Sequence, residues 1–102
     1  MTFNNKCYKI ISQIPEGKIA TYKQIAEILN TRAYRAVGNA LAKNRFPIII
    51  PCHRIIKNNG EIGGYALGVN KKISLLKNEG IKIKGYEIVD YEKYLHSFNQ
   101  TF

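Results

Sequence analysis

The fold is decided by residues 21–43, which read TYKQIAEILNTRAYRAVGNALAK. Thr21, followed three residues later by Gln24, forms the capping box that begins many helices. Apolar side chains at helical spacing then line one face of this first helix: Tyr22, Ile25, Ala26 and Leu29. After a break at Asn30-Thr31, a second helix is predicted at roughly residues 33–43. Two short helices joined by a tight turn are typical of a helix-turn-helix.

The second of these helices concentrates positive charge. Sixteen Lys and Arg against seven Asp and Glu give the chain a net charge of +9, which indicates either a polyanionic partner or a well-solvated surface. On this helix the inner face is predicted to be Ala36, Val37, Ala40 and Leu41, and the outer side to be Arg32, Arg35, Asn39 and Lys43. Its many small residues would let the helix backbone approach another helix or a nucleic-acid groove closely.

Outward from this centre, the pattern predicts a small α/β domain, mostly α, of winged-helix type. Residues 3–14 form an amphipathic helix that ends before Pro15, with Cys7 as a buried apolar side chain. Residues 46–56 are expected to be buried extended chain, and 58–60 a turn into a hairpin that ends at Gly63-Gly64. A further helix is marked by Val69, Ile73 and Leu76 and closes at Gly80.

The end of the chain is predicted to add two short elements. Residues 81–83 alternate as a strand does, and Asp90 would cap a last helix with one apolar face. That face is expected to carry Tyr91, Tyr94, Leu95 and Phe98.

Length and composition limit the class of protein. The 102 residues fit one domain, 1–102, and we expect it to be a monomer. Neither a signal peptide nor a membrane-spanning run is found, so the expected location is the cytoplasm or nucleoid of a prokaryote, or the nucleus of a eukaryote. Two distant cysteines are expected to be reduced thiols, and no zinc spacing links them to the two histidines. We therefore expect no metal and no cofactor.

The chemistry is expected at Pro51-Cys52-His53-Arg54. A free thiol, with a pKa of about 8.5, is only slightly ionised at neutral pH, so a nucleophilic cysteine needs a base or a positive environment. His53 is adjacent, but neighbouring side chains of extended chain point to opposite faces, so a bridging water could carry the proton. Glu79 could orient His53. From Cys52 and His53 alone, a buried thiol beside a surface histidine is equally compatible with the sequence.

This segment resembles the active-site motif of the O6-alkylguanine-DNA alkyltransferases. The resemblance continues through other motifs in the family's order and spacing, over roughly residues 4–83. These motifs are Arg35-Ala36-Val37-Gly38, Lys43-Asn44, Pro51-Cys52-His53-Arg54-Ile55-Ile56, Gly63-Gly64-Tyr65 and Asn78-Glu79-Gly80. It implies the catalytic type of domain that lies C-terminally in this family, without the additional N-terminal domain that many relatives carry.

The resemblance implies a single-turnover methyl or alkyl transfer from O6 of guanine in double-stranded DNA to Cys52. His53, through a water and backed by Glu79, would take the thiol proton, and the Tyr22 hydroxyl would assist the departing guanine. The second helix of the helix-turn-helix would enter the minor groove, and the damaged nucleotide would be flipped out of the duplex. Further expected DNA or lesion contacts are Arg35 as an intercalating finger, Asn44 as organiser of the turn before Cys52, the Ile55 carbonyl, Tyr65, Gly38 and Leu41.

Simpler interpretations of these residues remain open. Tyr22 could be a core residue, Arg35 an ordinary phosphate contact, and Glu79 an exposed helix-end acid. At the level of function, alkyltransferase-like lesion sensors resemble the chain but replace the acceptor cysteine, typically with tryptophan, and a winged-helix transcription factor would need none of these side chains. Leu67 is predicted to narrow the pocket against bulky alkyl groups.

Overall fold

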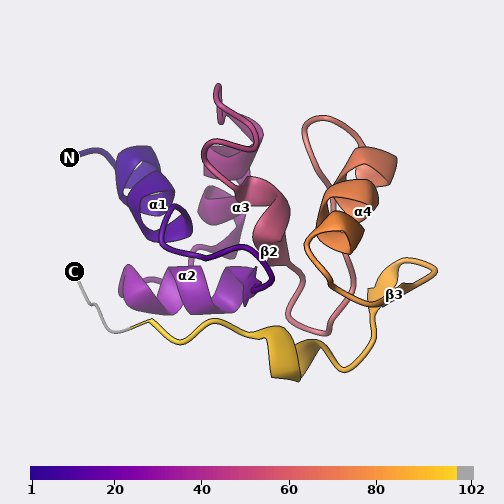
Figure 1. Ribbon diagram of the computed structural model, residues 1–102. Helices are drawn as coiled ribbons and strands as arrows, with labels where there is room; N and C mark the ends of the chain where they lie inside the picture. Colours follow the sequence, from indigo (N-terminus) through magenta and orange to yellow (C-terminus); the bar gives the residue numbers. More distant parts are fainter. Residues whose placement is uncertain (99–102) are drawn as a thin grey trace.

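The computed structural model describes residues 1–98 and shows a helical body with two small sheets (Figure 1). The helices are α1 (Phe3–Ile11), α2 (Tyr22–Ile28), α3 (Tyr34–Ala42) and α4 (Val69–Asn78), with short 3₁₀ helices η1 (Cys52–Arg54) and η2 (Tyr91–Tyr94). The strands are β1 (Ala20–Thr21), β2 (Ile55–Ile56), β3 (Ile83–Lys84) and β4 (Glu87–Ile88). β1 pairs with β2 in parallel and β3 with β4 antiparallel. The expected mixed, mostly helical class is confirmed.

The capping box predicted at the start of α2 is present. The Thr21 hydroxyl accepts a hydrogen bond from the backbone N–H of Gln24, and the Gln24 side chain accepts one from the N–H of Thr21. This reciprocal arrangement satisfies two of the N–H groups that a helix leaves unpaired at its start. Because Thr21 also belongs to β1, the cap fixes α2 directly to the strand that pairs with β2, the segment that follows Cys52.

Two hydrophobic clusters form the core. The first lies among α1, α2 and α3, and it includes the apolar stripe of α1 and the inner face of α3. The second lies beneath α4, with Ile19, Ile56, Ile62, Leu76, Ile81 and Ile88 as its buried members. None of the helices in the described part of the chain combines the length and apolar character needed to span a bilayer.

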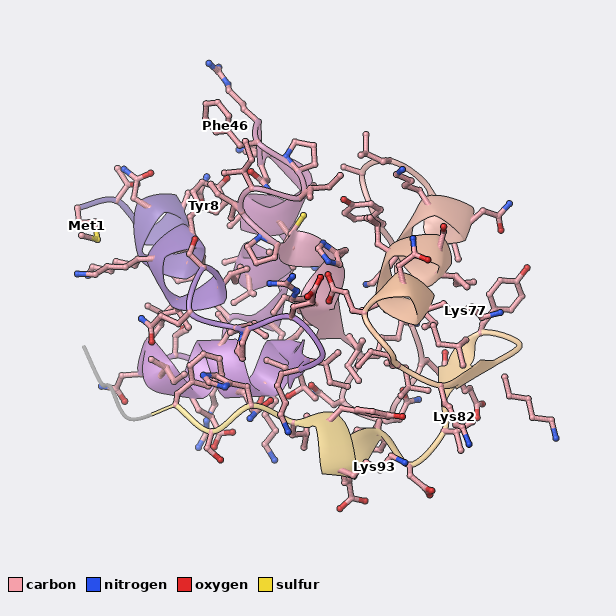
Figure 2. The ribbon with its side chains drawn as sticks, viewed as in Figure 1. Met1, Tyr8, Phe46, Lys77, Lys82 and Lys93 are labelled. Carbon is pink, nitrogen blue, oxygen red and sulfur yellow. The ribbon has the colours of Figure 1, made fainter. Side chains whose placement is uncertain are left out.

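The expectation of buried extended chain over residues 46–56 is wrong except at β2. Phe46, Ile48 and Ile49 are exposed, Ile49 by 79%, and Phe46 projects outward from a protruding loop (Figure 2). Pro47 and Pro51 cannot donate ladder hydrogen bonds, and the Ile50 N–H instead donates to the Phe46 carbonyl, 2.8 Å away, which folds the segment back on itself. Cys52 and His53 lie in η1, so the expected extended geometry at the motif is also corrected.

The last helix is shorter than its apolar spacing predicts. Asp90 has a left-handed backbone, φ 51°, and makes no side-chain cap, and only η2 follows it. The chain is then drawn into extended pairing, since the Ile19 N–H donates to the Tyr94 carbonyl and the His96 N–H to the Ile19 carbonyl. The predicted 58–60 turn exists, but its return segment bridges to Glu87, and the strand predicted at 81–83 is found at Ile83–Lys84. Tertiary pairing has overridden local periodicity here.

Candidate active site

Cys52 lies at the start of η1, where Asn44 organises the chain that leads to it. The Asn44 amide nitrogen donates to the Ile50 carbonyl at 2.9 Å and contacts the Cys52 sulfur at 3.3 Å, while its oxygen accepts from the Phe46 N–H at 2.9 Å. One side chain therefore closes the whole loop from the end of α3 to the thiol. Cys52 itself is 4% exposed, so the thiol is accessible only from one side.

His53, the residue after Cys52, makes a hydrogen bond to the end of α4. Its Nε2 lies 2.8 Å from Oε2 of Glu79, which occupies the C-cap of that helix. Arg54 grips the same carboxylate twice, Nε to Oε1 at 2.9 Å and Nη2 to Oε2 at 2.8 Å, and donates through Nη1 to the Ile14 carbonyl at 2.7 Å. Gly80 follows with φ +90°, which a glycine adopts without the Cβ clash that opposes it in other residues, and it ends α4 as predicted.

The charges of this group suit a proton acceptor. Burial lowers the pKa of His53 below its ordinary value, and the Glu79 hydrogen bond and charge offset that only in part. Burial alone would raise the pKa of Glu79, but the hydrogen bonds from Arg54 and His53 hold it below its ordinary value. At neutral pH the histidine is thus neutral and the glutamate ionised. His53 Nδ1 is buried and has no hydrogen-bond partner within residues 1–98.

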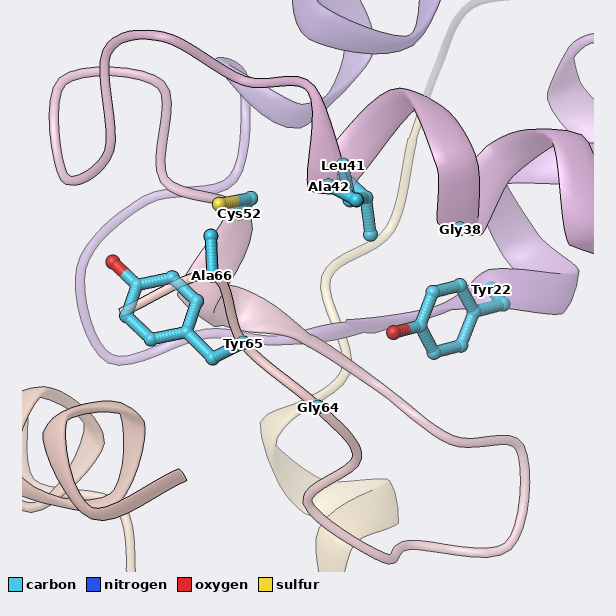
Figure 3. Close-up of a pocket in the computed structure, with 8 residues that line it drawn as sticks. All are labelled: Tyr22, Gly38, Leu41, Ala42, Cys52, Gly64, Tyr65 and Ala66. Atoms are coloured by element: carbon cyan, nitrogen blue, oxygen red, sulfur yellow. The ribbon is translucent and has the colours of Figure 1, made fainter. Parts of the chain in front are cut away.

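A pocket of about 290 Å³ opens beside the Cys52 thiol (Figure 3). α3 forms one wall, and Tyr22 and Tyr65 lie on opposite sides, with the Tyr22 hydroxyl directed inward. Burial raises the pKa of Tyr22, so its phenol keeps a proton that it can donate. Tyr22 is half-buried and lines the pocket rather than only the core. The complete lining is Tyr22, Gly38, Leu41, Ala42, Cys52, Gly64, Tyr65 and Ala66.

Most of the pocket lining is small. A Cβ added at Gly38 would meet nothing within 4 Å, so packing inside the described chain does not require a glycine there. Because Gly38 has no side chain, the surface of α3 at this position is open to a ligand. The prediction that Leu67 narrows the pocket is wrong: Leu67 is 50% exposed and outside the lining, and Ala66 is turned toward Cys52 instead.

A shallower groove of about 590 Å³ adjoins the pocket, since Tyr22 and Gly38 line both. Its remaining lining comes from two sides: Tyr34 and Arg35 on α3, and the 57–59 turn. Arg35 is exposed and does not enter the pocket. Two cationic side chains, Arg35 on α3 and Lys57 in the 57–59 turn, therefore flank the groove that adjoins the pocket at the thiol.

Lys72 is a feature of the site that was not among the site residues predicted from the sequence. Its side chain is fully buried on α4, and its ammonium donates to the Ile55 carbonyl at 2.5 Å and to the Gly64 carbonyl at 3.1 Å. Burial lowers the pKa of Lys72 to about 8, with the Cys52 thiol acting in the opposite direction. The Ile55 carbonyl expected to meet the guanine thus already accepts one hydrogen bond, and a carbonyl oxygen has a second lone pair available.

Other predicted residues lie in the core or beside the pocket. Cys7 is fully buried in the first cluster, and burial raises its pKa to about 11, which confirms its interpretation as a core residue. The Tyr65 ring meets His53 edge-on with centroids 6.3 Å apart. No group of three or more His, Cys, Asp or Glu side chains within residues 1–98 is placed to hold a metal ion. The role of Arg54 in clamping Glu79 was missed, because no spacing in the sequence signals it.

Residues 2–81 match the sequence model of the family described as 6-O-methylguanine DNA methyltransferase, DNA binding domain. The chain belongs to this family. Within it, the methylated-DNA--protein-cysteine methyltransferase of Saccharolobus solfataricus is 54% identical over 81 residues, which are 79% of this chain and 52% of that protein. A bifunctional methyltransferase/endonuclease of Picrophilus torridus is 38% identical over 97 residues, 93% of this chain and 32% of that protein. The chain spans about half the length of the first of these relatives.

Solved structures of the family share the fold. The Mycobacterium tuberculosis OGT in complex with DNA has a TM-score of 0.75 at 38% identity and covers 78% of this chain and 49% of its own. Atl1 of S. pombe, in complex with damaged DNA containing O6-carboxymethylguanine, has a TM-score of 0.82 at 27% identity, with 93% of this chain and 94% of its own covered. The fold shared with Atl1 thus extends over almost the whole chain.

Proposed function

We propose that this protein repairs DNA by moving a methyl or other alkyl group from O6 of guanine to Cys52, once per molecule. The observation that carries the proposal is the buried series Cys52, His53 and Glu79 beside a pocket that opens at the thiol. The relatives' names support the same reaction class. In this proposal the chain corresponds to the catalytic domain that lies C-terminally in the longer family members.

The chemistry proceeds by a single displacement. His53 Nδ1, the ring nitrogen not turned to Glu79, takes the thiol proton through a water, and the thiolate attacks the alkyl carbon. The bond between that carbon and O6 breaks, its electron pair passes to the guanine, and the Tyr22 hydroxyl supplies or shares a proton with the leaving base. The product is an S-alkylcysteine thioether, which has no good leaving group, so the protein reacts once.

The DNA would reach the thiol along the groove beside the pocket. α2 and α3 act as a helix-turn-helix, with the small residues of α3 turned to the minor groove and Arg35 filling the space of the flipped nucleotide. Tyr65, Leu41 and Gly38 then surround the extruded base, Asn44 holds the loop, and the second lone pair of the Ile55 carbonyl accepts from the guanine amino group. A single copy of the chain suffices for these contacts.

Intact mass spectrometry tests the reaction directly. The protein is mixed with a duplex that carries one O6-methylguanine, and Cys52→Ala is treated in parallel. A stoichiometric gain of one methyl group, absent from the Cys52→Ala variant, is the expected result. A mass that stays unchanged in the wild-type protein would overturn the proposal.

A second candidate function is lesion recognition without transfer. It is favoured by one observation, the match over nearly the full length of both chains to Atl1, whose structure contains damaged DNA. Cys52 argues against it, because the family resemblance implies that a lesion sensor would carry another residue at this position. Lesion-selective binding of the duplex with no gain in mass would select this function over the first.

A further inference from the structure

Residues 82–98 lie beyond the part of the chain that the family's sequence model matches, residues 2–81, yet they make hydrogen bonds to the body of the protein. After β4 the chain runs along α2 toward the C-terminus (Figure 1). It pairs with Ile19, which donates to the Tyr94 carbonyl at 2.9 Å and accepts from the His96 N–H at 2.8 Å. The Gln24 side chain donates to the His96 carbonyl at 3.1 Å. We call residues 82–98 the tail.

The tail packs against the 57–61 turn at close range. The Tyr91 hydroxyl donates to the Asn58 carbonyl at 3.2 Å, and the Tyr91 ring lies on Gly60. A Cβ at Gly60 would come within 2.6 Å of the ring, and the φ of +92° there also disfavours any other residue. The close packing of the Tyr91 ring on Gly60 therefore requires a glycine at this position.

Backbone hydrogen bonds with the tail also hold this turn. The Ile88 N–H donates to the Gly60 carbonyl at 3.0 Å, and the Ile62 N–H donates to the Tyr86 carbonyl at 2.8 Å. A separate contact comes from α2, where the N–H of Lys23 donates to the Asn58 side-chain oxygen at 3.0 Å. The turn is thus fixed between α2 and the tail.

This turn is one wall of the groove that leads to Cys52. Lys57, Asn58 and Asn59 line it opposite Tyr34 and Arg35 of α3. All three of these turn residues are exposed. Within the turn, the Gly60 N–H donates to the Lys57 carbonyl at 3.1 Å and the Lys57 N–H to the Glu61 carbonyl at 3.0 Å. These bonds shape the turn itself, whereas its contacts with α2 and with the tail fix its position relative to α3.

We infer that the tail sets the width of this groove for duplex DNA, and that Tyr91 is the positioning residue through which it acts. The inference rests on the proposed function, because that function makes the groove a DNA site. Contacts that are already in place in the free protein bind more tightly than contacts that must be ordered during association. Contacts with the phosphate groups of DNA fix the register of a protein on the duplex. Tyr91 touches neither the pocket nor the thiol.

The test compares Tyr91→Ala with Tyr91→Phe and with Tyr86→Ala, a matched change at a tail tyrosine whose side chain is 67% exposed. Single-turnover rates are measured against the concentration of an O6-methylguanine duplex. Tyr91→Ala is expected to raise the half-saturating concentration about fivefold, as loss of one hydrogen bond and its packing would, with the maximal rate unchanged. Tyr91→Phe, which keeps the ring, is expected to recover most of the affinity, and Tyr86→Ala to match the wild type.

Binding measured by fluorescence anisotropy in a Cys52→Ala background keeps this test separate from the reaction. If the wild-type protein fails to transfer methyl, the proposed function is lost, but the dissociation constants still decide the role of the tail. Equal affinity of Tyr91→Ala and its parent, an equal loss in Tyr86→Ala, or a fall in maximal rate with unchanged half-saturation would each overturn the inference. Thermal melting of each variant confirms that it is folded at the assay temperature.

Discussion

His53 Nε2 lies 2.8 Å from Glu79 Oε2, while His53 Nδ1 is buried without a hydrogen-bond partner in residues 1–98. Glu79 is held ionised by Arg54 and His53, so it can only accept, and Nε2 must carry the ring hydrogen. In the neutral ring the lone pair is then on Nδ1. The pairing with Glu79 therefore selects which nitrogen can receive a proton.

Glu79→Gln tests this selection. We expect the single-turnover rate on a methylated duplex to fall about tenfold or more, within the range of positioned acid–base groups, because an amide no longer fixes the tautomer. The free energy of unfolding should also fall by about 1–3 kcal/mol through loss of the Arg54 contacts. Glu16→Gln, at an exposed acid in the turn after α1, should leave both quantities unchanged, and a similar loss there would contradict the assignment.

The pH dependence follows from the lowered pKa of His53. The base must be neutral to accept a proton, so the rate should hold from neutral pH down past the ordinary histidine value of 6.5 and decline only below it. The free energy of unfolding should also decrease as the pH falls. Between the folded and unfolded pKa values the unfolded chain binds more protons, so the free energy of unfolding decreases as the pH falls below about 6.5. A rate that is half-lost at pH 7 or above, in a buffered single-turnover series, would refute this.

The lowered pKa of Lys72 predicts a further pH dependence of stability, in the alkaline range. Its pKa falls from 10.5 when exposed to about 8 when buried, so between these values the unfolded state binds more protons and stability rises with pH. Relative to Lys72→Met, the free energy of unfolding of the wild type should increase by up to about 3 kcal/mol from pH 8 to 10.5. Urea titrations of both proteins at several pH values measure this difference. Parallel curves would show that the ammonium is not buried in solution.

The pocket lining predicts which neighbour controls the size of the alkyl group. Ala66 lines the pocket and Leu67 does not, so Ala66→Leu should slow the reaction with O6-benzylguanine at least about tenfold more than the reaction with a methylated duplex, by overfilling a closely lined site. Leu67→Ala, the matched change one residue along, should alter the ratio of the two rates less than twofold, as expected for an exposed site. The reverse ranking would restore the prediction made from the sequence.

The fold was predictable where local signals agree with tertiary structure. The Thr21 and Gln24 capping box, the apolar stripe of α1 and the glycine after α4 all act within a few residues, and each was located correctly. The loop before Cys52 was not, because its conformation depends on a single asparagine that bonds across it. Likewise, η2 ends early because the chain pairs with Ile19, about 75 residues away in sequence.

The site shows the same division. Cys52 and His53 are adjacent and can be suspected together, but 26 residues separate His53 from Glu79. The residues alone offered Glu79 only as one possible partner of His53, and the family resemblance assigned it that role. Lys72 could not be identified as a buried residue, since a lysine among five lysines between residues 71 and 84 is usually solvated. Its fully buried position depends on two backbone carbonyls that no sequence pattern identifies.

Arg54 has a consequence for cooperativity. Its guanidinium bonds to the Ile14 carbonyl, in the cluster around α1, and to Glu79, at the end of the helix that covers the other cluster. Loss of either half of the core would remove one of the partners of this partly buried guanidinium, which links the two halves energetically. The two clusters should therefore unfold in one transition, and methyl-transfer competence should disappear at the same denaturant midpoint as the helical circular dichroism.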